Sequence, residues 1–172
     1  MKVIVDSGPL MALGKINALN LLHQIYGQTR IPSAVYDEVV TRGLETGQQD
    51  AYTVQLAVRR NEIIIVEISD QELDERVRDL PLGRGERHVI HLGLKEIADL
   101  VLMDDALARE KSENLGLKVK GTLGAIVDAF KKKVLSLEEV ELIFQSLRER
   151  DDIWISDKLI QRVLDDLRKQ GQ

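Results

Sequence analysis

Short apolar runs alternate with segments of helical periodicity along this chain of 172 residues. Apolar runs at residues 2–5, 63–68 and 100–103 predict strands, and two shorter strands are predicted at residues 30–31 and 117–120. Strands that are apolar on both faces are typical of a parallel sheet, because the connections between parallel strands place helices on each face. The sequence therefore predicts an α/β fold with three layers, α/β/α, around a mostly parallel sheet of about five strands.

Helical periodicity and turn residues predict the helices between and after these strands. We expect helices at residues 10–13, 16–25, 33–40, 48–60, 70–78, 86–97, 104–115 and 122–133, with Gly43, Gly47 and Gly116 as breaks. Two more are expected at residues 137–149 and 157–169, the first opened by a capping box at Ser136 and Glu139. We interpret residues 1–133 as the α/β domain and residues 134–172 as a C-terminal helical extension packed on it.

Composition and charge restrict the function classes. The chain has no cysteine, which excludes disulfides, zinc sites made of thiolates and cysteine nucleophiles. No apolar run approaches the roughly 18 residues of a membrane helix, and the first residues do not resemble a signal peptide. We therefore expect a cytoplasmic protein without membrane association. The net charge of -5 argues against binding nucleic acid through bulk basic charge, but not against an acidic site that holds a metal.

Acidic residues follow several of the predicted strands. Asp6 comes directly after the first strand, and Asp104 and Asp105 come after the strand at residues 100–103. Glu38 lies on the helix after Ile31, and Glu86 opens a helix. Each acid alone is typical of a turn, a helix cap or a solvated helix face. Together they are more informative, because the carboxyl ends of parallel strands meet at one edge of the sheet.

A cluster of carboxylates has a physical requirement. Ionised carboxylates repel one another, so one of them keeps its proton unless a cation neutralises the group. Oxygen ligands, without cysteine and with only three histidines, favour Mg²⁺ or Mn²⁺ over zinc. His88 and His91 have a spacing that metal sites use, but without a nearby cysteine or histidine partner a packing or surface role is favoured for both.

Five blocks in chain order resemble those of PIN-domain ribonucleases, in a subfamily related to VapC-type toxins. The blocks are Val3–Leu10 (VIVDSGPL), Ile31–Val39 (IPSAVYDEV), Leu82–Glu86 (LGRGE), Leu100–Arg109 (LVLMDDALAR) and Gly116–Gly124 (GLKVKGTLG). Each block alone is weak, but five in order with sensible spacing are fairly specific. The resemblance covers roughly residues 2–133.

The resemblance implies a ribonuclease that depends on Mg²⁺ or Mn²⁺ and hydrolyses phosphodiester bonds of RNA, with a 5′-phosphate and a 3′-hydroxyl as products. It also implies that Asp6, Glu38, Glu86 and an aspartate after the fourth strand, Asp104 or Asp105, form the acidic set. All five are predicted catalytic residues, and Asp6, Glu86, Asp104 and Asp105 are assigned to the metal. The implied biological role is the toxin of a toxin–antitoxin pair, with an antitoxin protein that covers the acidic cleft.

Four residues near these acids are candidates for substrate binding. Ser7 follows the first aspartate and could orient it or the metal-bound water, and Arg84, Arg87 and Arg109 could contact substrate phosphate. Solvated helix faces explain the three arginines about as well.

Two other functions compete with the nuclease. One is a PIN-like module that binds RNA or a protein without cutting. The other is a receiver-like phosphoacceptor domain, which normally has an acidic pair after its first strand, whereas Asp6 is followed by Ser7, and Lys118 or Lys120 would have to serve as its lysine.

The last two predicted helices carry apolar stripes. The stripes contain Leu142, Ile143, Leu147, Ile160, Val163, Leu164 and Leu167. Core packing explains such stripes, and so does a surface for a second copy or a partner. We expect a homodimer.

Overall fold

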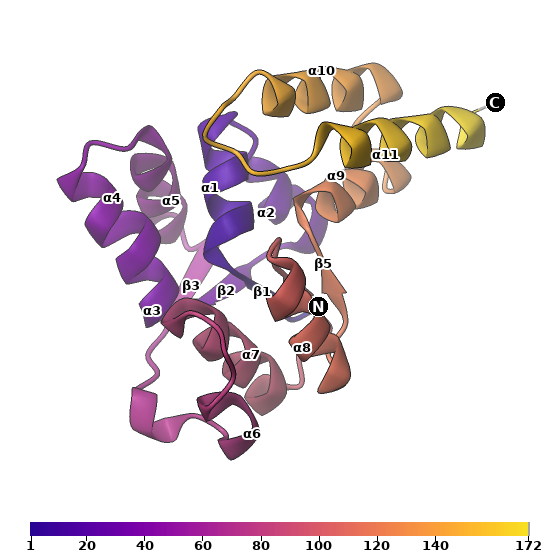
Figure 1. Ribbon diagram of the computed structural model, residues 1–172. Helices are drawn as coiled ribbons and strands as arrows, with labels where there is room; N and C mark the ends of the chain where they lie inside the picture. The colour runs from indigo at the N-terminus through magenta and orange to yellow at the C-terminus, as the bar shows by residue number, and fades with distance from the viewer. Residues whose placement is uncertain (172) are drawn as a thin grey trace.

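All five strands lie parallel in one sheet between two layers of helices (Figure 1). The structure, a computed structural model, describes residues 1–171. The strand order is β3-β2-β1-β4-β5. The strands are β1 (Val3–Val5), β2 (Thr29–Pro32), β3 (Ile63–Val66), β4 (Leu100–Leu102) and β5 (Val119–Lys120). The predicted α/β/α architecture is confirmed, with a sheet that is wholly parallel.

The helices divide between the two faces of the sheet. Helices α1 (Ser7–Lys15), α2 (Asn20–Tyr26), α5 (Gln49–Arg59) and α9 (Thr122–Lys131) form one layer, in which α1 packs against both α5 and α9. Helix α7 (Arg84–Glu96) covers β1, β2 and β4 from the other side, next to α8 (Ala106–Asn114). The three residues of β1 are completely buried between these layers. Because β1 is the central strand, its carboxyl end lies in the middle of the sheet edge.

The register of the strands aligns their carboxyl ends. Val5 of β1 is paired with Leu102 of β4, and Leu102 is paired with Lys120 of β5. The Asp6 backbone N–H extends this ladder by donating to the Leu102 carbonyl over 2.9 Å. Asp6, the aspartates after β4 and the turn after β5 therefore lie at the same edge of the sheet, as expected for the carboxyl ends of parallel strands.

The helix predicted at residues 33–40 has a more complex form. It consists of α3 (Ser33–Tyr36), a π-helical turn (Asp37–Thr41) and α4 (Arg42–Glu45). Gly43 lies inside α4 and does not end the helix as predicted. The residue is a glycine because a Cβ there would lie 2.6 Å from the Ala51 Cβ of α5. The break occurs at Gly47, which has a φ of +70°. Glu38 thus lies on a π turn, a feature that is frequent at functional sites.

The helix predicted at residues 70–78 is interrupted. A 3₁₀ turn (Asp70–Glu72) is followed by α6 (Glu75–Arg78), and two buried histidines of α7 bind this segment. His88 Nε2 lies 2.7 Å from Asp70 Oδ1, and His91 Nδ1 accepts a hydrogen bond from the Asp74 N–H over 3.0 Å. The packing role predicted for these histidines is confirmed.

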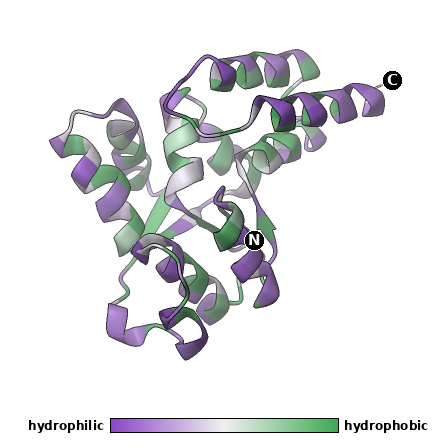
Figure 2. Ribbon diagram, viewed as in Figure 1, coloured by the Kyte–Doolittle hydropathy of each residue, from purple (hydrophilic) through white to green (hydrophobic). Residues whose placement is uncertain are grey.

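Helices α10 (Leu137–Arg148) and α11 (Asp157–Gln170) pack on α9. Their ribbons alternate between hydrophobic and hydrophilic residues, as expected for helices with one buried face (Figure 2). Of the apolar stripes, Leu147, Ile160, Leu164 and Leu167 are buried, whereas Leu142 is 64% exposed. The capping box is confirmed, because the Ser136 and Glu139 side chains each accept a hydrogen bond from the other residue's backbone N–H. The domain boundary after residue 133 stays a prediction.

Within residues 1–171, no helix is both long enough and apolar enough to cross a membrane.

Candidate functional site

Asp6 lies at the centre of the sheet edge and is almost completely buried. Its side chain directly follows β1, and the residue is 4% exposed. Its Oδ1 atom is buried and has no hydrogen-bond partner among the described residues. Buried polar atoms nearly always have a partner, so a carboxylate oxygen left without one needs an explanation.

The surroundings of Asp6 disfavour its ionised form. Burial raises the pKa of the Asp6 carboxyl to about 7, although the Ser7 backbone N–H partly opposes this shift. The negative charges of Glu86, Glu38 and Asp104 contribute to this rise. The sheet edge therefore brings four of the predicted acids within electrostatic range of one another.

Glu86 belongs to the same acidic group. It lies in the first turn of α7, where its Oε2 atom accepts a hydrogen bond from the Gly83 N–H over 2.9 Å. Burial raises the pKa of Glu86, the Gly83 N–H lowers it, and the charges of Asp105 and Glu38 raise it. Asp105 is thus close enough to act on Glu86, while Asp104 acts on Asp6.

Glu38 approaches α7 closely because residue 85 is a glycine. A Cβ at position 85 would lie 3.0 Å from Glu38 Oε2, so the Glu38 carboxylate would have to shift by a few tenths of an ångström. The glycine of the Leu82–Glu86 block therefore leaves room for Glu38 at the start of α7. Between them is a hollow of about 270 Å³, and its lining includes Ser7, Glu38, Arg42, Arg84 and Glu86.

Asp104 and Asp105 have different partners. Asp104 accepts a hydrogen bond from the Thr122 N–H over 2.7 Å and another from the Thr122 hydroxyl over 2.6 Å. Asp105 caps α8 by accepting from the Ala108 N–H over 2.9 Å. Gly121 makes room for Asp104, because a Cβ at that position would lie 2.8 Å from Asp104 Oδ1.

Thr122 is the contact that sequence reasoning missed. We placed the Gly121–Gly124 turn in the fifth block of the resemblance, without a role for Thr122. The signal was available, since this turn follows the last strand of the same parallel sheet and so lies at the same edge as Asp104.

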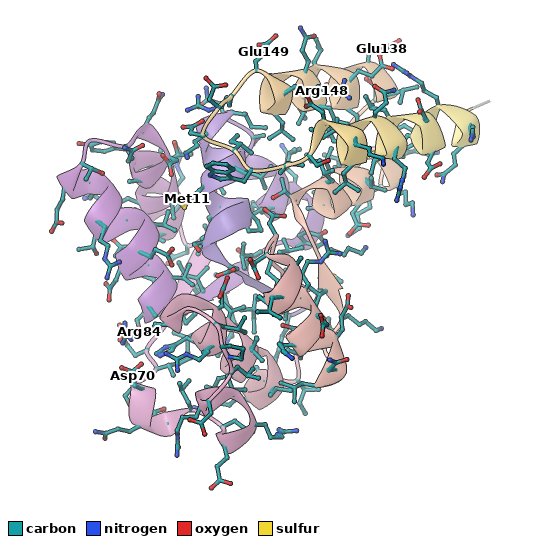
Figure 3. The ribbon with its side chains drawn as sticks, in the orientation of Figure 1. Met11, Asp70, Arg84, Glu138, Arg148 and Glu149 are labelled. Atoms are coloured by element: carbon teal, nitrogen blue, oxygen red, sulfur yellow. The ribbon has the colours of Figure 1, made fainter. Side chains whose placement is uncertain are left out.

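Two of the predicted substrate-binding arginines have protein partners. Arg84 Nε donates to Asp70 Oδ1 over 2.9 Å, and the two labelled side chains lie next to each other in Figure 3. Arg87 Nη1 donates to the Arg78 carbonyl over 2.8 Å. Both arginines thus tie α7 to residues 70–78, although Arg84 also lines the hollow beside Glu38.

Arg109 differs from these two arginines. Within residues 1–171 it has neither an ion pair nor a side-chain hydrogen bond, and it lines a hollow together with Asp104. Its Nη1 atom is 3.5 Å from the position that a Cβ of Gly121 would take. Arg109 is therefore the predicted arginine whose guanidinium is available beside an acid of the site.

Comparison with known proteins identifies the family. A family model described as a PIN domain matches residues 2–169. This chain belongs to the PIN-domain family. No curated protein and no solved structure matches the chain. PIN domains are generally nucleases, so the match favours hydrolase chemistry over the receiver-like alternative. The closer relation to VapC-type toxins stays a prediction.

PIN domains typically use divalent metals, and the acids of this PIN domain fit such an ion in part. The donors are all carboxylate oxygens, which hard divalent cations prefer. The Asp6 Oδ1 atom lacks a partner among the described residues, and the pKa values of Asp6 and Glu86 are raised, first by burial and further by neighbouring carboxylates. In the described part of the chain, however, the side chains are not arranged so that three acidic or histidine residues form a group that could hold a metal.

Proposed function

We propose that this PIN domain is an endoribonuclease that depends on Mg²⁺ or Mn²⁺ and hydrolyses phosphodiester bonds of RNA. The observation that carries the proposal is Asp6, a buried carboxylate whose Oδ1 atom has no partner and which lies among other acids. Such an arrangement destabilises the folded chain, because burial and repulsion both act against the charge. A divalent cation would relieve both costs.

Asp6, Glu86, Asp104 and Asp105 would hold the metal, and Glu38 adds negative charge from the π turn. The bound metal would supply a positive charge that lowers the pKa of a coordinated water and offsets charge on the phosphate. Thr122 fixes the orientation of Asp104 through two hydrogen bonds. Arg109 would contact the substrate phosphate, and Ser7 lies where its hydroxyl could orient Asp6 or the water. We expect products with a 5′-phosphate and a 3′-hydroxyl.

The five blocks that resemble VapC-type toxins support a biological role as a toxin, with an antitoxin that covers the acidic cleft. A cytoplasmic location, inferred from composition, and a homodimeric state, inferred from the apolar stripes of the last two helices, complete the proposal. An antitoxin segment that reaches this cleft would need basic side chains to complement the carboxylates.

A PIN domain that binds RNA without cutting it is the second candidate. One observation favours it: both oxygens of Asp104 already accept hydrogen bonds from Thr122. A carboxylate engaged in this way has less freedom to move toward a cation.

The first test is a calorimetric titration of Mn²⁺ into the wild type and Asp6→Asn, followed by an assay of both on single-stranded RNA. We expect metal binding and cleavage in the wild type and neither in Asp6→Asn. Asp128→Asn is the matched control, since Asp128 is a largely buried aspartate whose charge is already paired with Lys120. A wild type that does not bind metal contradicts the proposal, and so do products with a cyclic phosphate. Binding of both metal and RNA without cleavage favours the second candidate.

Titrations of Asp104→Asn and Asp105→Asn extend this test to the two aspartates after β4. The variant with the larger loss of Mn²⁺ affinity identifies the aspartate that contributes more to the metal site.

A further inference from the structure

Trp154 is the only tryptophan of the chain, and its position is unusual for such a large apolar side chain. It lies between α10 and α11 and is 94% exposed. Its neighbours Ile153 and Ile155 pack against the core. The segment is therefore extended with alternate side chains turned inward, and Trp154 is the one that faces solvent.

The segment that carries Trp154 is attached to the end of α1. The Lys15 ammonium donates to the Asp152 carbonyl over 3.2 Å and pairs with the Asp152 carboxylate at 3.3 Å. Arg150 donates to the Lys15 carbonyl over 3.4 Å and also pairs with Asp152. In Figure 1 the connection between α10 and α11 passes across α1. These contacts hold the residues before Trp154 on α1, and the packing of Ile153 and Ile155 holds its two neighbours, so the exposure of Trp154 is a feature of the fold.

Trp154 borders two adjoining hollows that both reach Asp104. The first has a volume of about 390 Å³, and its lining includes Asp104, Arg109, Gly121, Trp154, Leu159 and Val163. The second has a volume of about 500 Å³ and extends along Gly8, Met11 and Lys15 of α1. Both volumes are within the range of roughly 300–1,000 Å³ that small-molecule sites have.

The lining of the first hollow matches the parts of a nucleotide. Trp154 provides an aromatic face, and Leu159 and Val163 extend it with aliphatic surface. Arg109 provides a guanidinium without an ion pair in the described part of the chain, next to Asp104. An aromatic face binds a base of any sequence by stacking, and a guanidinium binds phosphate.

We propose that the first hollow is a base-stacking subsite, in which Trp154 stacks on one unpaired base of single-stranded RNA and Arg109 contacts the adjacent phosphate. The inference rests on the proposed function and adds a substrate class to it. Bases within a duplex stack on their neighbours and are not free to stack on Trp154, so the subsite selects single strands. The uncommitted positive charge beside the ring favours a nucleic acid over an apolar protein segment as the occupant.

The emission of Trp154 reports on this subsite alone, because the chain has no other tryptophan. The experiment titrates a short single-stranded RNA of mixed sequence into Asp6→Asn, which is expected not to cut it. The same RNA annealed to its complement is the second probe. We expect quenching by the single strand and none by the duplex.

Variants in the same Asp6→Asn background measure the contribution of the ring. Trp154→Ala should weaken binding of single-stranded RNA about tenfold, and Trp154→Phe should retain most of the affinity. Tyr52→Ala is the matched control, because Tyr52 is an aromatic residue of α5 that is 57% exposed. We expect its RNA affinity to be that of the parent. Thermal unfolding of each variant checks that the fold is intact.

Fluorescence and cleavage separate the subsite from the proposed function. Suppose that the wild type cuts the RNA, but the RNA neither quenches Trp154 nor binds more weakly to Trp154→Ala. This result would contradict the subsite and leave the proposed nuclease function unaffected. If the RNA quenches Trp154 and its affinity depends on Trp154, but the wild type never cuts it, the subsite is supported and only the nuclease function is contradicted. Equal quenching by single strand and duplex overturns the subsite. A change of Trp154 emission with protein concentration in the absence of RNA would identify a contact between copies and overturn the subsite as well.

Discussion

Asp6 and Asp128 are both largely buried aspartates, but their carboxylates have opposite surroundings. Asp128, on α9, accepts a hydrogen bond from the Tyr26 hydroxyl over 2.6 Å, and both its oxygens lie 2.7 Å from the Lys120 ammonium. Burial raises the pKa of Asp128, but the bonds from Lys120 and Tyr26 outweigh it, so the pKa is lowered. Asp6 has no such cation, and burial raises its pKa to about 7.

This difference is expected if Asp128 is a structural carboxylate and Asp6 is the functional carboxylate that we propose. The same chain supplies Asp128 with a cation and a hydroxyl, so a buried acid can be compensated within this fold. The charged neighbours that act on Asp6 are instead other acids. Groups with a strongly shifted pKa and a specific set of charged neighbours are frequent at functional sites, because the missing partner is a ligand.

The largest expected effect is a gain of stability in Asp6→Asn without metal. The pKa of Asp6 is about 7 in the folded chain against a model value of 3.8, so folding favours the protonated form. The free energy of unfolding of the wild type should therefore fall as pH rises from about 4 to about 7 and then level off. Because asparagine does not ionise, Asp6→Asn avoids this loss, which is up to about 4 kcal/mol.

Urea unfolding at pH 4 and pH 8 in the presence of EDTA measures this difference. The advantage of Asp6→Asn over the wild type should be larger at pH 8 than at pH 4. An equal stability difference at the two pH values would show that ionisation of Asp6 does not destabilise the fold. The proposed contrast with Asp128 would then be wrong.

Mn²⁺ should provide Asp6 with the compensating positive charge that Lys120 provides for Asp128. A ligand that binds only the folded state stabilises it by about 2.7 kcal/mol at a concentration a hundred times its Kd. We expect a rise in the Tm of the wild type at pH 8 on addition of Mn²⁺, and little change in Asp6→Asn. If Ca²⁺ and Mn²⁺ raise the Tm of both proteins equally, the ions bind elsewhere.

Asp128→Asn should destabilise the protein, the opposite of Asp6→Asn. At pH 7 the substitution removes an ionised acceptor and leaves Lys120 without its partner, which costs about 2 kcal/mol. The folded pKa of Asp128 is lowered, so its contribution is present at neutral pH and is lost as pH falls below about 4. Urea unfolding at pH 7 and pH 3 tests this, with a smaller difference expected at pH 3. A variant as stable as the wild type at pH 7 would remove the contrast between the two aspartates.

Tyr26→Phe gives the smallest expected effect. It removes one donor to Asp128 and leaves the Lys120 pair in place, so we expect a loss of about 1 kcal/mol. RNA cleavage should be unchanged, since Tyr26 contacts Asp128 and not the acidic group. A loss of cleavage in a folded Tyr26→Phe would connect the two regions and contradict their separation.

The sheet and the acids at its edge could be predicted because both depend on local pattern and a general rule of topology. Continuous apolar runs identified the strands, and a parallel sheet brings the ends of its strands to one edge. Asp6 was placed beside Glu86 and Asp104 in this way, and its altered pKa agrees with that placement.

Three features could not be predicted because they depend on contacts between distant elements. The π turn at Glu38 is a helix distortion, and the periodicity of residues 33–40 does not distinguish it from a regular helix. The two hydrogen bonds from Thr122 to Asp104 depend on the register of β4 and β5; the sequence places both residues at one edge of the sheet but does not specify that register. The exposure of Trp154 follows from the Lys15 and Arg150 contacts that hold its turn on α1.

The central position of β1 also affects when the acidic group can form during synthesis of the chain. Asp6 is made among the first residues, but β1 needs β4 at residues 100–102 as its second neighbour in the sheet. Asp104 gains its hydrogen bonds only when Thr122 has been made. A nascent chain on the ribosome therefore carries Asp6 for most of translation without the assembled site. A product of premature termination before residue 122 would contain all five acids but lack the two hydrogen bonds from Thr122, so Asp104 would not be held as it is in the complete chain.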